Sequence, residues 1–163
     1  MYPASYSLDN IVSVAAMSEK NHLAPFSNYG AKAVHLAAPG TNIFSTCVIN
    51  NENMTFYENM ASYINVIGSG NSCYACGIGT SFAAPFVTGT LALLKAQFPE
   101  ESYQSLIARL LAGVDKLPEL EGKVKTGGKL NIYNALTGSK PILPIPPSGK
   151  NGESFRSWYE SNW

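Results

Sequence analysis

The sequence predicts an α/β domain with a mainly parallel sheet and flanking helices. Short runs rich in Val, Ile and Ala come first and helical patterns follow, up to about residue 137. This arrangement of apolar runs is typical of buried strands combined with covering helices. The 163 residues suit one domain or a large part of one, and 45% of them are hydrophobic, which is enough to build a core.

Three stretches near the N-terminus are expected to be extended. Residues 10–17 and 33–38 are rich in Val, Ile and Ala and suit buried strands, and a Pro-Gly pair closes the second as a turn. Residues 43–48 continue as extended chain. Residues 49–72 are polar and rich in Asn and Gly, and we interpret them as a hairpin or excursion. That segment either shapes a groove or decorates the surface.

Three helices are expected after residue 80. From about Ser81 to Gln97 the chain is apolar nearly all round, which places this helix in the interior, and Gly89 is expected to let a neighbouring element come close. Residues 101–114 carry an apolar stripe at i, i+3, i+4, i+7 and i+8. A short last helix covers about residues 131–136.

The most informative segment is GIGTSFAAPFVTG, residues 77–89. Pro85 is expected in the first turn of the helix, because its missing N–H costs nothing there. Ser81 lies four residues earlier, so it is predicted at or just before the helix start. Unpaired N–H groups and the positive end of the helix dipole then surround its hydroxyl. Such a position can stabilise a developing oxyanion.

Five ordered motifs resemble those of the subtilisin-like serine proteases, or subtilases. The segment GTSFAAP at residues 79–85 resembles their nucleophile motif. The other matches are residues 2–6 with 10–16, 26–30, 36–40, and 127–131 with 135–136. The resemblance implies a partial subtilisin-like three-layer fold, in which residues 1–137 form the C-terminal part of a peptidase domain whose N-terminal half is missing. Its sheet would present an open apolar edge.

The resemblance also implies roles around the serine. Ser81 is the nucleophile, and its backbone N–H is one oxyanion donor. Thr80 either supports the oxyanion hole from behind or caps the helix.

Four residues are expected to bind substrate. Gly79 and Phe82 flank the nucleophile, and Phe82 replaces a usual methionine and narrows the leaving-group side. Tyr2 and Pro3 resemble a turn, often held cis, near the floor of the specificity pocket. Phe86 replaces a usual histidine and is expected in the core.

Two members of the subtilase triad have no counterpart in this chain. The triad follows the order Asp, His, Ser, and neither the Asp-Thr/Ser-Gly nor the His-Gly-Thr-His segment of the family occurs. His22 lies in a polar turn and His35 in an expected strand, and neither has a carboxylate spaced to orient its ring. We therefore expect a serine endopeptidase fragment that is inactive alone.

Two alternatives to the fragment remain open. One is a non-catalytic remnant or binding module that uses an aromatic tail. The other is a self-sufficient hydrolase with His22 or His35 as its base.

Composition and resemblance together limit the partners. Acidic and basic residues balance at 11 each, so we expect no binding of nucleic acid. The sequence has no uninterrupted run of eighteen apolar residues, so we expect no transmembrane segment. For the parent protein the resemblance implies a polypeptide substrate, the missing N-terminal half of the same domain as a partner, and a secreted or envelope-associated location. Calcium is common in the family, but no acidic cluster identifies a site, so we assign no metal ligand.

The three cysteines are Cys47, Cys73 and Cys76. The CYAC spacing suits metal ligands, but no second pair completes four of them. We expect packed or free thiols.

The composition changes after residue 137. Residues 138–152 are predicted to form a Pro-rich linker. Residues 153–163 form an aromatic tail, which is either a small docking helix or a free end. Its aromatic residues, at near-helical spacing, are Phe155, Trp158, Tyr159 and Trp163.

Overall fold

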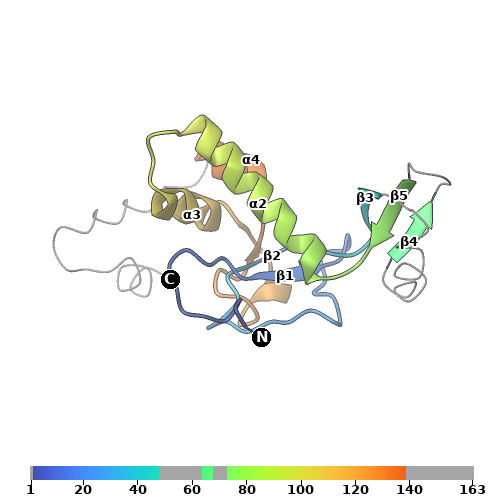
Figure 1. The fold of residues 1–163 in the computed structure, drawn as a ribbon. Helices are drawn as coiled ribbons and strands as arrows, with labels where there is room; N and C mark the ends of the chain where they lie inside the picture. The colour runs from blue at the N-terminus through green and yellow to red at the C-terminus, as the bar shows by residue number, and fades with distance from the viewer. Residues whose placement is uncertain (1, 48–63, 68–72, 139–163) are drawn as a thin grey trace.

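Two sheets and three α-helices make up the fold in the computed structural model, which describes residues 2–47, 64–67 and 73–138 (Figure 1). The elements are, in chain order, β1 (Val14–Met17), β2 (Leu36–Pro39), β3 (Ile43–Cys47), β4 (Ile64–Ile67), β5 (Cys73–Gly77), α2 (Thr80–Gln97), α3 (Tyr103–Ala112), β6 (Asp115–Lys116), the 3-10 helix η1 (Pro118–Leu120), β7 (Gly128–Lys129) and α4 (Ile132–Thr137). The α/β class predicted from the sequence is confirmed.

The larger sheet has the strand order β1-β2-β7-β6. β1 and β2 are parallel, with Val14 opposite Leu36, and β7 is parallel to β2, with Lys129 opposite Ala37. β6 is an antiparallel edge of two residues. The sheet is therefore mainly parallel, as expected.

Both early strands are shorter than the sequence suggests. β1 keeps only the last four of residues 10–17, and β2 is displaced from 33–38 to Leu36–Pro39. His35 therefore precedes the strand in which it was expected. Its N–H still donates to Ser13 O at 2.9 Å, so the ladder begins irregularly one residue before β2.

The edge of β1 that was expected to be open is covered at its centre by the chain itself. Ala16 N–H donates to Ser27 Oγ at 2.8 Å, and Ala16 O accepts from Ala24 N–H at 3.0 Å. A strand edge is aggregation-prone when its backbone groups lack partners. At Ala16 the loop after β1 supplies both partners, so the expected open edge is not open along its whole length.

The two faces of the larger sheet support separate cores, because successive strand side chains point to opposite faces. On one face, three buried strand residues pack with the α-helices: Ala16, Leu36 and Ala38. On the other face, three more pack with η1 and the loop after it: Ala15, Met17 and Ala37. All three α-helices thus cover one face (Figure 1).

α2 is buried on only one side among the described residues. Its buried residues are Ala83, Val87, Thr90 and Leu94. The expected interior position of the whole helix is therefore wrong, and Phe86, expected in the core, is exposed. Gly89 does not admit a close neighbour either, because no described atom lies within 4 Å of a Cβ built there.

The other two helices agree with the sequence within two residues at each end. α3 is capped by Ser102, and α4 begins after Asn131, whose side chain accepts from Asn134 N–H at 2.9 Å. The stripe predicted for α3 is buried at Leu106, Ile107, Leu110 and Leu111. None of the described helices is both long and apolar enough to cross a bilayer.

The smaller sheet is antiparallel, with the order β3-β5-β4, and lies beyond the start of α2 (Figure 1). It includes part of the segment 49–72, whose residues 64–67 form β4. Cys47 is opposite Cys73 in the β3–β5 register and is disulfide-bonded, whereas Cys76 is a half-buried free thiol. The expectation of packed or free thiols is therefore wrong for Cys47. The rest of 49–72, and the linker and tail beyond Gly138, lie outside the described residues.

Candidate active site

Ser81 is the second residue of α2 and its side chain is exposed. This confirms its predicted position at the start of the helix. Pro85, however, is the sixth helical residue and lies in the second turn, not the first. The ring leaves the carbonyl of Ser81 without its usual i+4 donor, and the helix continues nonetheless to Gln97.

Two glycines set the turn that presents Ser81. Gly79 is the helix N-cap with φ 144°, in the region that favours glycine, and a Cβ there would lie 3.2 Å from Ser81 Oγ. Its N–H donates to Gly40 O at 2.8 Å. A Cβ on Gly40 would meet Ala16 and lie 3.0 Å from Gly79 O. Close backbone approach at these glycines therefore holds Ser81 at the carboxyl end of β2.

The sequence identifies Gly40 only as part of a turn after β2 and does not reveal its place beside Ser81. The structure shows a second task, which is to accept the hydrogen bond that anchors the Gly79 turn. The Pro-Gly pair directly after an expected strand does indicate a tight turn at Gly40. No local pattern in the sequence, however, shows that this turn contacts residue 79.

The amide groups of the first turn remain available beside Ser81. Within the described part of the chain, neither the Ser81 N–H nor its Oγ has a hydrogen-bond partner. Phe82 N–H donates back to Gly79 O at 3.0 Å. The first turn carries no acidic side chain that would neutralise the positive end of the helix dipole. The site can therefore offer the Ser81 N–H to a developing negative charge.

Thr80 does not cap the helix. Gly79 holds the N-cap position, no side chain makes a capping hydrogen bond there, and Thr80 is the first helical residue. The capping alternative for Thr80 is therefore wrong, and its support of an oxyanion hole stays a prediction.

Phe82 packs toward the smaller sheet. Its ring fills the space that a Cβ on Gly77 would need, at the end of β5. Gly77 therefore lets the strand pass over the aromatic ring just before α2 begins. The effect of Phe82 on the leaving-group side stays a prediction, as does substrate binding by Gly79.

The Tyr2–Pro3 peptide bond is cis, as the resemblance implied. Tyr2 packs on Tyr6 with ring centroids 4.9 Å apart, and both rings are exposed. Their contribution to a specificity pocket stays a prediction.

His35 is engaged far from Ser81. Its Nδ1 accepts from Ser13 N–H at 2.9 Å. Burial, followed by the nearby charge of Lys125, lowers the pKa of His35 from 6.5 to about 4. His35 precedes β2 whereas Gly40, which contacts the Ser81 turn, follows it. Five extended residues at about 3.3 Å each separate the two by about 16 Å.

His22 lies on the other side of the sheet from α2. It is exposed in the turn after β1, and its charge adds a small contribution to the lowered pKa of Glu119, which is due mainly to the hydrogen bond from Lys123. Glu119 belongs to η1, which packs on the face opposite the helices. Neither histidine is therefore placed to take a proton from Ser81.

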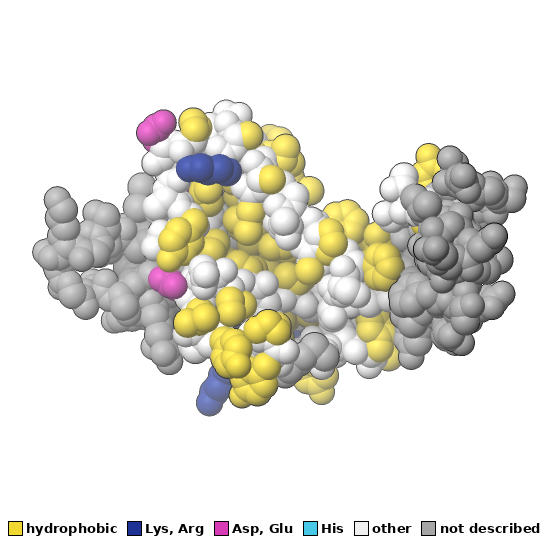
Figure 2. All heavy atoms as spheres, viewed as in Figure 1, with side chains coloured by type: hydrophobic (Ala, Val, Ile, Leu, Met, Phe, Trp, Pro, Cys, Tyr) yellow, Lys and Arg dark blue, Asp and Glu magenta, His cyan; other side chains and the backbone are white. Residues whose placement is uncertain are grey.

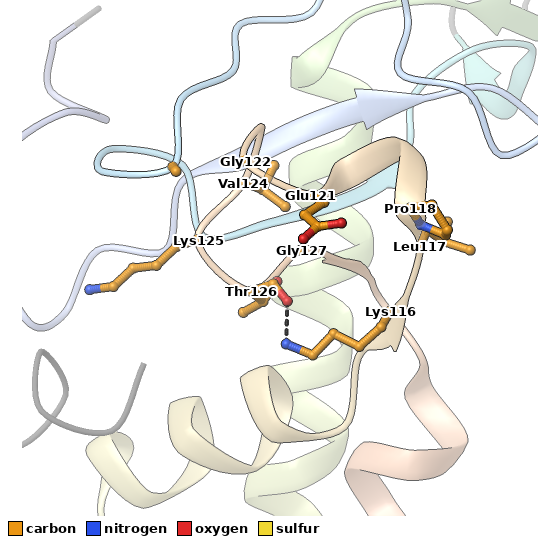
Figure 3. Close-up of a pocket in the computed structure, with 10 residues that line it drawn as sticks. Lys116, Leu117, Pro118, Glu121, Gly122, Val124, Lys125, Thr126 and Gly127 are labelled. Atoms are coloured by element: carbon orange, nitrogen blue, oxygen red, sulfur yellow. Dashed lines mark hydrogen bonds between the residues drawn. The ribbon is translucent and has the colours of Figure 1, made fainter.

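A cavity of about 610 Å³ is formed by η1 and the loop after it, and none of its lining residues belongs to α2 (Figure 3). Lys116 extends along it and its Nζ donates to Thr126 O. This cavity is thus separate from the Ser81 turn. Across the described residues, no group of three or more His, Cys, Asp or Glu side chains is arranged to hold a metal ion.

An exposed serine at the start of a helix that covers a mainly parallel sheet, with its own amide unpaired among the described residues, is an arrangement that a serine hydrolase can use. The model of the subtilase family matches residues 1–125. The chain belongs to the subtilase family.

Known relatives are proteases that are much longer than this chain. Minor extracellular protease Epr of Bacillus subtilis (strain 168) is 40% identical over 161 residues, which cover 99% of this chain and 21% of that protein. Extracellular basic protease of Dichelobacter nodosus is 44% identical over 88 residues, or 54% of this chain and 12% of the relative. Subtilisin-like protease 3 of Plasmodium falciparum (isolate 3D7) is 33% identical over 150 residues, or 88% and 17%. The chain spans at most about a fifth of these relatives.

Solved structures agree with this assignment. The A-subunit of the AB5 toxin from E. coli superposes with a TM-score of 0.62 at 26% identity, covering 85% of this chain and 43% of that one. Fervidolysin from Fervidobacterium pennivorans, a keratinolytic enzyme related to subtilisin, gives a TM-score of 0.58 at 27% identity, covering 91% and 21%.

Proposed function

We propose that this chain supplies the nucleophile of a serine endopeptidase. The observation that carries the proposal is the exposed Ser81 hydroxyl beside its unpaired N–H in the first turn of α2. Ser81 Oγ attacks the scissile peptide carbonyl and gives its proton to a general base, while the Ser81 N–H donates to the oxyanion. The amine leaves with a proton, and water hydrolyses the acyl-serine ester.

The general base belongs to a part of the catalytic domain that these 163 residues do not include. Both histidines of the chain are placed elsewhere, and a serine without a base is a weak nucleophile at neutral pH. A groove of about 440 Å³ between α2, α3 and Asn10 offers a surface for that part, lined by Leu91, Tyr103, Leu106 and Ile107. We therefore expect the isolated chain to be inactive.

Reconstitution tests the proposal. The chain is assayed on a peptide substrate alone and co-expressed with the N-terminal half of a subtilase domain that carries the Asp and His motifs. The chain alone should not hydrolyse the peptide, and the complex should. Ser81→Ala should abolish the activity, whereas Ser7→Ala, at another exposed serine, should leave it unchanged.

Two outcomes would contradict the proposal. Hydrolysis that survives Ser81→Ala would exclude Ser81 as the nucleophile. Hydrolysis by the chain alone that is lost in Ser81→Ala would show that no outside base is needed.

The parent protein is proposed to act on polypeptides outside the cytoplasm. Support comes from relatives named as extracellular proteases in Dichelobacter nodosus and Bacillus subtilis. Antibodies against the chain should detect the parent protein in the culture medium or the cell envelope of its source. Detection only in the cytoplasm would contradict this location.

A further inference from the structure

An apolar groove of about 510 Å³ runs along the exposed side of α2, between this helix, β3 and α4. Its largest side chains come from all three elements: Phe44, Phe82, Phe86, Leu93 and Ile132. Phe44 is 63% exposed and Leu93 is 51% exposed. Figure 2 shows hydrophobic side chains gathered on the surface over α2 and toward the smaller sheet. Contiguous apolar surface of this kind usually marks an interaction site.

The groove has room for large side chains. No charged residue lines it, and its volume falls within the range of about 300–1,000 Å³ of sites that hold drug-sized ligands. Gly89 lines its centre, where a Cβ would meet no described atom within 4 Å. From Phe82 to Leu93 the groove follows α2 for about 16 Å, at about 1.5 Å per residue.

We propose that the aromatic tail of the same chain, residues 153–163, docks in this groove. In the tail Phe155, Trp158 and Tyr159 stand at i, i+3 and i+4, the spacing of one helical face. A helix this short is marginal in water and needs an apolar surface to pack on. The groove offers aromatic and aliphatic side chains without a competing charge.

The linker allows the tail to reach the groove. Ile132, the first residue of α4, lines the groove, and the described fold ends at Gly138, about 9 Å further along at the rise of an α-helix. Residues 139–152 join this point to the tail. As an extended Pro-rich chain they span up to about 40 Å, at about 3.1 Å per residue.

The two tryptophans of the chain, Trp158 and Trp163, both lie in the tail, so tryptophan fluorescence reports on the tail alone. Acrylamide quenching is measured on the full chain and on its Gly89→Leu variant. The leucine fills the groove, and the helix should tolerate it because the space around Gly89 is open. We expect the quenching constant to be at least about twofold lower in the full chain than in a synthetic peptide of residues 153–163, and Gly89→Leu should raise it to the value of the peptide.

Thr88→Leu is the matched control. It adds the same side chain at the neighbouring exposed position of α2, which does not line the groove, and it should leave quenching unchanged. Far-ultraviolet circular dichroism confirms that each variant keeps its helices. Quenching in the full chain equal to that of the peptide would overturn the proposal. So would equal quenching in the full chain and Gly89→Leu, or shielding that disappears on dilution, because shielding that depends on concentration comes from a second copy.

Discussion

The two long helices of this domain both have a serine near their start, but the two serines have different surroundings. In α3, Ser102 is the N-cap, and its Oγ accepts from Ser105 N–H at 3.2 Å. In α2, Gly79 is the N-cap, and Ser81 stands inside the first turn with its hydroxyl unpaired among the described residues. A serine that caps its helix is structural. With Gly79 at the cap of α2, no described backbone group uses the hydroxyl of Ser81 in the first turn.

The helices also differ in how much of their apolar surface they bury. α3 buries its stripe at Leu106, Ile107, Leu110 and Leu111. Its Arg109 contacts the segment that follows α2, because it pairs with Glu101 at 2.6 Å and lies 3.9 Å above the ring of Phe98. α2 is apolar on nearly every side and leaves one side exposed. We infer that α2 is built to make more contacts than the described residues supply.

The largest predicted difference in stability is between substitutions on the buried side and on the exposed side of α2. Leu94 is fully buried and its neighbour Leu93 is 51% exposed. Leu94→Ala should lower the free energy of unfolding by about 2–5 kcal/mol, because it removes packed methyl groups and leaves a cavity. Leu93→Ala should cost about 1 kcal/mol or less. Urea denaturation of the two variants measures the difference, and equal losses would mean that both sides of α2 are packed alike.

His35 is a polar group that the fold uses, as it uses Ser102, and its burial should make the stability of the chain depend on pH. Its pKa is about 4 when folded and 6.5 when unfolded, so between these values only the unfolded chain binds the proton. Stability should be complete above about pH 6.5 and should fall as the pH drops toward 4, by about 3 kcal/mol in all. Thermal unfolding from pH 7 to pH 4 measures this loss.

Two histidine variants locate the source of the pH effect. His35→Asn keeps an acceptor for Ser13 N–H but does not titrate, so it should flatten the dependence. His22→Asn, at an exposed turn, should leave it unchanged. A pH dependence that disappears in His22→Asn and persists in His35→Asn would contradict the role given to the burial of His35.

The two serines should differ in their effect on folding. Ser102→Ala removes the cap of α3 and should cost about 1 kcal/mol. Ser81→Ala removes a hydroxyl that has no partner among the described residues, and should change stability by no more than about 0.5 kcal/mol. Chemical denaturation of both variants checks this. A loss at Ser81 as large as that at Ser102 would show that its hydroxyl also serves the fold.

The smallest effect should come from Gly89. Gly89→Ala should stabilise the chain by about 0.5–1 kcal/mol, because alanine is the better helix former and a Cβ there meets open space. A rise in the thermal midpoint checks it. Destabilisation would mean that whatever occupies the groove packs directly against this glycine and leaves no room for a methyl group.

The sequence predicts the α/β class, the three helices and the place of Ser81, because strand composition, helical periodicity and the glycine-rich approach to the serine are local signals. It fails where the answer depends on distant partners. Pro85 fixes the start of the helix only approximately, since a second-turn proline loses one hydrogen bond and the helix continues. The hydrogen bond from Gly79 to Gly40 joins residues far apart in the chain, and no local pattern indicates that Cys47 is disulfide-bonded.

The exposure of α2 was missed for a related reason. Apolar residues all round a helix indicate that every side should be covered, and they do not identify what covers it. Phe86 and Gly89 were therefore assigned to packed positions, although they line a groove. The predicted burial would hold if another segment covered the exposed side of α2.

Labelling with a fluorophosphonate, followed by peptide mass spectrometry, tests the central claim most directly. The chain is labelled in complex with a segment that supplies the acid and the base. We predict that the probe is attached to Ser81 and that Ser102 stays unmodified. Attachment to Ser102 or another serine, with Ser81 unmodified, would contradict the account.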